Sequence, residues 1–223
     1  MPETTRMHIE MITVGPAESN CYIVWNDAGE AMVIDPGGDP DRIVSVIDEH
    51  NLCVVAYPLT HGHVDHVSAL SSVFEQHPAP IGMHPEDARW AFSSVNQMLP
   101  WYSQPELPAD IAMHYDEGQE WTHAGFTYRI LFTPGHSPGG VCFLFTDQRV
   151  LFSGDCLFHQ SIGRTDLPGG DAPELAASLR RIMELPDDTR VCPGHGPETT
   201  LGAERQANPF ILQLDAFEEK SEN

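Results

Sequence analysis

The sequence has almost no lysine, no long apolar run and no closely spaced cysteine pair. Lys220 is the only lysine, and 11 basic residues against 33 acidic ones give a formal net charge of −22. Binding to nucleic acid or to an anionic membrane relies on lysine and arginine, so neither is an expected partner. No apolar stretch reaches the roughly 18 residues of a membrane-spanning helix, and we expect no signal peptide because no apolar run follows the first residues. We therefore expect a cytoplasmic protein.

The chain contains five cysteines without a C-x-x-C pair: Cys21, Cys53, Cys142, Cys156 and Cys192. Four of them lie in apolar or strand-like surroundings, which predicts buried free thiols and agrees with a reducing compartment. Cys156 differs from the others because it directly follows a candidate metal ligand, Asp155.

The chain has 223 residues, of which 41% are hydrophobic and 20% charged, as expected for a single globular domain over residues 1–223. Apolar runs predict strands at 8–14, 21–25, 31–34, 54–59, 80–84, 126–132, 141–145, 149–152 and 189–192. Helical patterns begin at Asp39-Pro40 and cover 68–77, 86–98 and 173–185, whereas 99–116 is predicted to be an irregular loop or lid. The order of elements indicates two similar halves packed as helix, sheet, sheet and helix.

Four side chains that can bind metal follow the strand at 54–59: His61, His63, Asp65 and His66. Imidazole suits zinc and iron, and a carboxylate suits divalent cations generally. Alternation sends His61 and His63 to one side and leaves Asp65 and His66 to turn elsewhere. The spacing therefore favours two metal ions over one.

Three more polar residues each stand just past the end of an apolar strand: His136, Asp155 and His195. Any one of them alone could be a capping or loop residue. Loops at one edge of a rigid scaffold are where sites are usually built, so we expect the three to join the histidine loop. The seven side chains together are what two metals that share one bridging carboxylate require. Asp35, in the turn after 31–34, is either an outer partner of a ligand histidine or a plain turn residue.

The pattern His-x-His-x-Asp-His at 61–66 resembles the signature of the metallo-β-lactamase superfamily. The segment Gly163-Arg164-Thr165-Asp166 and the stretch 193–202 are similar to the compact, single-domain members of its glyoxalase-II-like branch. This resemblance spans about residues 8–213. It implies an α/β fold, a four-layer αββα sandwich with metals at one end of the two sheets.

The resemblance also implies which residue binds which metal. One ion would take His61, His63 and His136, the other would take Asp65, His66 and His195, and Asp155 would bridge them. Two divalent ions are expected, with zinc as the first choice and iron or manganese as alternatives. A metal lowers the pKa of bound water from 15.7 to roughly 7, so hydroxide can attack at neutral pH.

The implied activity is hydrolysis of thioesters such as S-D-lactoylglutathione by attack of that hydroxide on the acyl carbon. Asp65 and Asp155 are the catalytic candidates. Arg164 is either a binding residue for an anionic, small-molecule substrate or a structural partner of Asp166. Because 28 residues follow His195, we expect no C-terminal helical domain of the kind with which long glyoxalase II enzymes bind glutathione. We expect a monomer or a small homo-oligomer.

The main alternative is a persulfide dioxygenase of the same superfamily. Such enzymes retain the seven residues but bind one iron through two histidines and one aspartate, which here would be His61, His136 and Asp155. The Gly196-Pro197 ending favours the hydrolase. Hydrolysis of β-lactams is not expected, because a bridging Asp155 is not the lactamase pattern.

Overall fold

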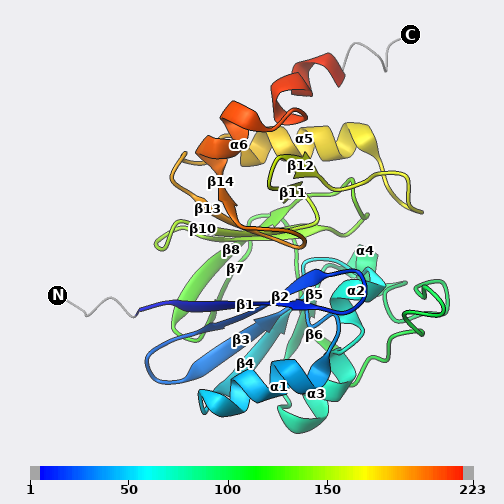
Figure 1. Ribbon diagram of the computed structural model, residues 1–223, viewed down its shortest axis with the longest axis vertical. Coiled ribbons are helices and arrows are strands. Elements are labelled where there is room, and N and C mark those ends of the chain that lie inside the picture. The colour runs from blue at the N-terminus through cyan, green and yellow to red at the C-terminus, as the bar shows by residue number, and fades with distance from the viewer. Residues whose placement is uncertain (1–5, 218–223) are drawn as a thin grey trace.

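Two six-stranded mixed sheets face each other in the computed structural model, which describes residues 6–217 (Figure 1). In spatial order the first sheet contains β1 (His8–Val14), β2 (Ser19–Trp25), β3 (Glu30–Ile34), β4 (Cys53–Pro58), β5 (Ile81–Met83) and β6 (Ile111–His114). The second contains β14 (Thr199–Thr200), β13 (Arg190–Pro193), β10 (Val150–Gly154), β9 (Val141–Phe145), β8 (Phe126–Phe132) and β7 (Glu120–His123). A small hairpin joins β11 (Leu157–Phe158) to β12 (Ser161–Ile162).

Central strands of both sheets are buried on their two faces, which is why they appear in the sequence as continuous apolar runs. In β2, Cys21 and Ile23 face the helices while Tyr22 and Val24 face the other sheet. The core between the sheets is rich in aromatic rings from the second sheet: Phe126, Tyr128, Phe143, Phe145 and Phe152. Because the side chains of a strand alternate in direction, one apolar strand contributes to the core between the sheets and to the core between its sheet and the helices.

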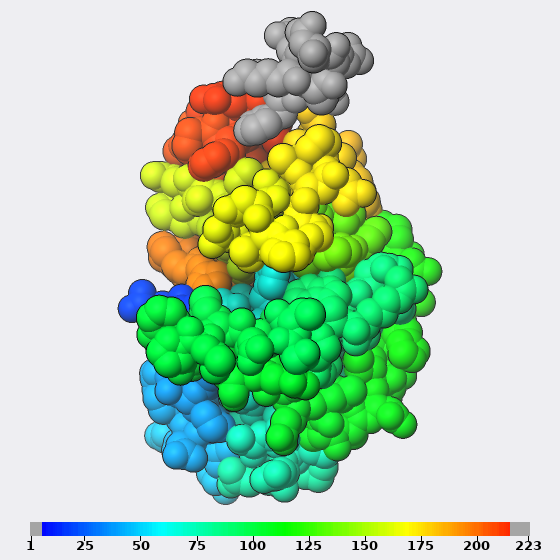
Figure 2. Space-filling view, turned by 90° about the vertical axis from the view of Figure 1, so that its right-hand side faces the viewer, coloured from blue at the N-terminus to red at the C-terminus, as the bar shows by residue number. Residues whose placement is uncertain are grey.

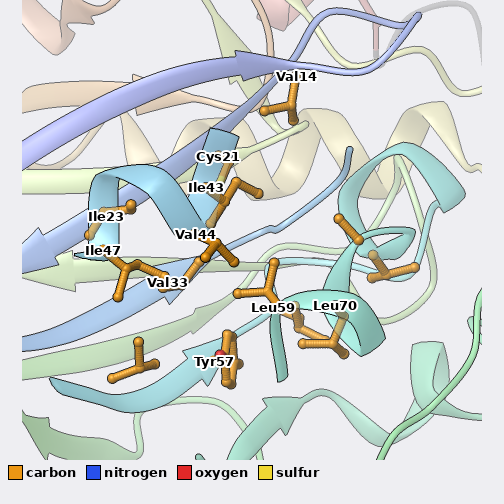
Figure 3. Close-up of a cluster of buried hydrophobic side chains, with 14 of the residues drawn as sticks. Val14, Cys21, Ile23, Val33, Ile43, Val44, Ile47, Tyr57, Leu59 and Leu70 are labelled. Atoms are coloured by element: carbon orange, nitrogen blue, oxygen red, sulfur yellow. The ribbon is translucent and has the colours of Figure 1, made fainter. Parts of the chain in front are cut away.

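The outer face of the first sheet is covered by α1 (Pro40–Glu49) and α3 (Leu70–Gln76), as Figures 1 and 3 show. The predicted start at Asp39-Pro40 is confirmed, with proline in the first turn of α1. Ile43, Val44 and Ile47 form the buried stripe of α1. Burial of one such aliphatic side chain stabilises the fold by about 1.5–3 kcal/mol.

The outer face of the second sheet is covered by α5 (Ala172–Ile182) and α6 (Leu201–Ala207), followed by a 3-10 helix, η1 (Ile211–Phe217). Asp171 caps α5, since its side chain accepts a hydrogen bond from the backbone N–H of Glu174. Leu175, Leu179 and Ile182 pack against the sheet. The layers therefore follow the order helix, sheet, sheet, helix, and the predicted α/β, αββα fold is confirmed (Figure 1).

The helix predicted over 86–98 is wrong, because α4 (Pro85–Ala88) ends after one turn. Beyond α4, turn-type backbone bonds, such as the one from the Ser93 N–H to the carbonyl of Trp90, and bonds from side chains replace the helical pattern. The Ser93 hydroxyl donates to the carbonyl of Trp90, and the Asn96 amide donates to that of Ala91. Serine and asparagine compete with helical hydrogen bonds in this way. The chain instead forms turns beside the histidine loop.

Several short strands were missed by the sequence analysis. β6 lies inside the stretch predicted to be irregular, and β7, β11, β12 and β14 have two to four residues each, too few to show a pattern. Of the cysteines, Cys53 is exposed and the other four are buried, Cys156 among them. No helix within residues 6–217 is long and apolar enough to cross a membrane.

Candidate metal centre

Four strands deliver the predicted ligands to the same edge of the molecule, the right-hand side of Figure 1. After β4 the chain passes through His61 and His63 into the short helix α2 (Val64–Val67), which carries Asp65 and His66. The other three side chains follow the ends of β8, β10 and β13, in the order His136, Asp155 and His195. The structure thus brings together all seven side chains that were predicted to bind metal.

The first cluster contains His61, His63 and His136, with one ring nitrogen from each lying within 4.8 Å of the others. Nδ1 of His63 lies 2.8 Å from Nε2 of His136. The ring centroids of His61 and His136 are 5.0 Å apart. Three imidazoles that converge in this way could hold one metal ion.

The second cluster contains Asp65, His66 and His195. Nε2 of His195 lies 3.2 Å from Oδ2 of Asp65 and 3.4 Å from Nε2 of His66. Asp155 lies between the clusters: its Oδ2 is 3.4 Å from Nε2 of His136, and its Oδ1 is 3.3 Å from Nε2 of His66. Asp155 is therefore within reach of both clusters, as expected of a bridging carboxylate.

Three of the histidines have their Nδ1 atoms occupied by groups outside the clusters. Nδ1 of His61 contacts the Thr60 hydroxyl at 3.0 Å, and Nδ1 of His66 contacts Oδ2 of Asp35 at 3.0 Å. Nδ1 of His136 donates to the backbone carbonyl of Arg164 at 2.7 Å. Such partners fix the tautomer and leave Nε2 free to face a metal.

Two polar atoms at the centre test whether a metal fits. Nε2 of His61 and Oδ1 of Asp155 are buried and have no hydrogen-bond partner within the described chain. Buried polar atoms in native proteins are normally paired. Backbone packs closely around them: a Cβ on Gly194 would lie 2.1 Å from Oδ1 of Asp155 and 2.8 Å from Cε1 of His66. The donor atoms, their burial and the close packing all fit bound cations.

The charges of the centre balance without any basic side chain of lysine or arginine. Burial, followed by the charge of His136, lowers the pKa of His63 to about 4. Burial alone would lower the pKa of His66, but Asp155 and Asp65 raise it well above its usual value. Burial alone would raise the pKa of Asp155, but His66 holds it well below its usual value. Ionised carboxylates and neutral imidazoles bind metal, so a cation at the second cluster would take the place of the proton that Asp155 and Asp65 favour on His66.

Asp35 is an outer partner and not a turn residue alone. Its Oδ1 accepts from the backbone N–H of Thr60 at 2.8 Å, and its Oδ2 accepts from the hydroxyl of Thr60 and faces His66. Asp35 also lies within metal-binding distance of His61 and His66. Because both of its oxygens are already hydrogen-bonded, we assign it the supporting role.

Arg164 borders the centre through its backbone, while its side chain forms a two-pronged ion pair with Asp166 at 2.6 and 2.7 Å. The pair is exposed to solvent, so the guanidinium can still be approached.

His159 lies 3.4 Å from Glu204, outside both clusters. Two neighbours of the first cluster were missed by the sequence analysis: Asp87, which binds Gly62, and Trp90, whose ring centroid is 5.3 Å from that of His63. No local pattern marks either residue.

The ligand-bearing edge opens into a hollow on the surface. Figure 2 looks onto this edge and shows the hollow between the yellow segment near residues 165–175 and the green segment near 90–105. Cyan atoms from the region of the histidine loop form its floor. The candidate metal centre is therefore reachable from solvent, and His63, Asp65 and His195 are its partly exposed members.

Comparison with known proteins agrees with this geometry. The sequence profile of the Metallo-beta-lactamase superfamily matches residues 14–195. The chain is 36% identical to the hydroxyacylglutathione hydrolase GloC of Haemophilus influenzae over 92% of its length and 98% of that protein. Among solved structures, the BLEG-1 B3 metallo-beta-lactamase superposes with a TM-score of 0.85 at 38% identity, covering 92% of this chain and 99% of that one. The structure of TTHA1623 in a di-iron-bound form superposes with a TM-score of 0.81 at 39% sequence identity, covering 90% of this chain and 99% of that one. The chain belongs to the metallo-β-lactamase superfamily.

Proposed function

We propose that this protein is a metal-dependent hydrolase of thioesters such as S-D-lactoylglutathione. The observation that carries the proposal is the pair of ligand clusters with Asp155 between them, at the floor of an open hollow. The name of the GloC relative, a hydroxyacylglutathione hydrolase, supports this substrate class.

The proposed ligands are His61, His63 and His136 for one ion and Asp65, His66 and His195 for the other, with Asp155 shared. Two divalent ions held there would lower the pKa of a bound water molecule towards 7 and would polarise a carbonyl oxygen. Asp155 would neutralise charge on both sides, and Asp65, which is partly exposed, would accept a hydrogen bond from a water molecule held at the centre. Zinc is the expected metal; the di-iron form of TTHA1623 makes iron the first alternative, followed by manganese.

A thioester suits the residues around the centre because its leaving group needs no proton. A thiol has a pKa of about 8.5, so the thiolate departs readily near neutral pH. The carboxyls of Asp65 and Asp155 are proposed to be ionised when they bind metal, so neither is available as a proton donor. An amide differs from a thioester in this respect, because its leaving amine must be protonated.

Arg164 is proposed to orient an anionic substrate at the rim of the hollow. The exposed pair with Asp166 presents the guanidinium without burying it. We further propose that the enzyme acts in the cytoplasm, because all five cysteines are free thiols, a state that a reducing compartment maintains.

The test is elemental analysis of protein purified without added metal, combined with three assays. Two metals per chain with hydrolysis of S-D-lactoylglutathione would support the proposal. One iron per chain with oxygen uptake on glutathione persulfide would replace it with the dioxygenase. Because BLEG-1 carries the name of a lactamase, a β-lactam is the third substrate, and faster turnover of the β-lactam than of the thioester would also contradict the proposal.

A further inference from the structure

A buried carboxylate outside the ligand set connects two of the ligand loops. Asp87 lies in α4, is fully buried and accepts three hydrogen bonds. Its Oδ2 accepts from the backbone N–H of Gly62 at 2.8 Å and from the hydroxyl of Ser137 at 2.7 Å. Its Oδ1 accepts from the backbone N–H of Gly139 at 2.6 Å.

These three donors come from the two loops that form the first cluster. Gly62 stands between His61 and His63, and Ser137 directly follows His136. The first loop follows β4 of one sheet and the second follows β8 of the other. One carboxylate therefore links the halves of the molecule at the point where His63 and His136 approach to 2.8 Å.

The three donors can be satisfied together only by a group that accepts on both of its oxygens. An ionised carboxylate does so, whereas an amide would turn an NH2 group towards one of the N–H donors. The space is also closed to a longer side chain, since a Cβ on Gly139 would already lie 2.8 Å from Cγ of Asp87. Burial raises the pKa of Asp87, while the hydrogen bonds from Ser137 and the backbone oppose that rise.

The same turn region holds the other side of the Gly62 peptide. The Asn96 amide donates to the carbonyl of Gly62 at 2.7 Å, while Asp87 accepts from its N–H. The ring of Trp90 lies against His63. Both polar backbone atoms of Gly62 are thus hydrogen-bonded. These bonds fix the backbone from which the imidazoles of His61 and His63 project.

We propose that Asp87 is a positioning residue that sets the distance between His63 and His136 and so forms the first metal site. This inference rests on the proposed two-metal centre but not on the substrate. Asp35 has the corresponding place beside His66 in the second cluster. Asp35 reaches the first cluster only through the Thr60 hydroxyl, which contacts His61, so the direct support of Asp87 and of Asp35 would go to different metal sites.

The test is the zinc content and zinc affinity of Asp87→Asn, measured by chelator competition on the full chain. Loss of an outer partner typically weakens metal binding 10–100-fold. We expect that loss for one zinc equivalent, with the second unchanged. In the NMR spectrum of cobalt-substituted Asp87→Asn, the shifted imidazole N–H signals of the first cluster should disappear, and those of the second should remain. The spectra of His63→Ala and His195→Ala show which signals belong to which cluster. Glu86→Gln, which changes the neighbouring exposed carboxylate, is the matched control and should bind both equivalents normally.

An equal loss of affinity for both zinc equivalents in Asp87→Asn, or no loss for either, would overturn the proposal. If Asp87→Asn does not fold, as judged by the thermal unfolding of metal-free protein, Ser137→Ala takes its place, because it removes one donor and leaves the carboxylate. A several-fold loss confined to the first cluster is then expected, and an unchanged affinity would overturn the inference. Wild-type protein that binds two metals but hydrolyses no thioester would refute the substrate and leave the role of Asp87 standing.

Discussion

The carboxylate of Asp35 faces Nδ1 of His66 at a distance of 3.0 Å, and both groups are buried. Asp35 comes from the turn after β3, where its backbone is left-handed with a φ of 51°. That turn places the carboxylate beneath α2, so that Nε2 of His66 points to Asp155 and His195. One residue of the first sheet thus orients a proposed ligand of the second metal.

Replacing Asp35 by alanine should weaken metal binding at the second cluster. Without the carboxylate, His66 loses the partner that fixes its tautomer, and 10–100-fold lower affinity is expected for one zinc equivalent. Competition with a chromophoric chelator measures this directly. Asp48→Ala, which removes an exposed carboxylate from α1, should leave the affinity unchanged; a similar loss in both variants would contradict the role given to Asp35.

Replacing Asp155 by alanine should disturb both metals. Asp155 reaches His136 on one side and His66 on the other, so in the proposed centre its loss would remove a charge that neutralises both cations. We expect fewer than two metals per chain and at least a 100-fold loss of kcat/KM, equivalent to about 2.7 kcal/mol of transition-state stabilisation. Mass spectrometry under native conditions gives the stoichiometry. A variant that keeps both metals and the full rate would show that Asp155 is not the bridge.

The sequence was sufficient to predict the layers of the fold and the convergence of the seven side chains, because both follow from strands. Runs such as Val141–Phe145 are buried on two faces, and the polar residue after each run must then lie at an edge of its sheet. Where a strand has two residues, as in β12 or β14, no such run exists, and these elements were missed.

The supporting role of Asp87, unlike that of Asp35, could not be predicted in the same way. Asp87 contacts Gly62, Ser137 and Gly139, which are 25 to 52 positions away, and its own surroundings in the sequence show only a helix start. The helix predicted over 86–98 did not allow for contacts with the histidine loop, since a continued helix would carry Asn96 away from Gly62. The break depends on hydrogen bonds that only the folded loops supply.

Removal of metal should abolish hydrolysis while leaving the sheets folded. The hydrophobic layers do not include the ligand side chains, so the fold does not depend on metal alone. After dialysis against a chelator we expect at least a 100-fold lower rate with an almost unchanged far-UV circular dichroism spectrum. Return of the rate with zinc, iron or manganese then identifies the metals that support catalysis. A metal-free protein with an undiminished rate would refute the mechanism.

Substitution of Arg164 should change substrate binding more than turnover. Arg164→Ala is expected to raise KM for S-D-lactoylglutathione a few-fold, with little change in kcat, because the contact is with a charged part of the substrate far from the reacting carbon. A neutral thioester should show no such increase. If Arg164→Ala raises KM equally for S-D-lactoylglutathione and for the neutral thioester, and Asp166→Ala does the same, the Arg164–Asp166 ion pair at 2.6 Å is structural.

His84 should make the stability of the protein depend on pH below neutrality. Its Nδ1 accepts a hydrogen bond from the backbone N–H of Glu86 and caps α4, and its ring stacks on Phe132 at 4.5 Å. Burial lowers the pKa of His84 below its usual 6.5. The unfolded chain therefore binds the proton more tightly, and this group costs stability as the pH falls through 6.5 towards the lower folded pKa.

In His84→Asn, asparagine is a good cap that does not titrate, so this part of the pH dependence should vanish. We expect the wild type to lose up to about 1 kcal/mol more than the variant between pH 7.5 and 5.5, the scale of one helix cap. Urea unfolding of the metal-free proteins at both pH values measures the difference, since the other histidines titrate alike in both and cancel. Parallel pH profiles would show that protonation of His84 does not break the cap.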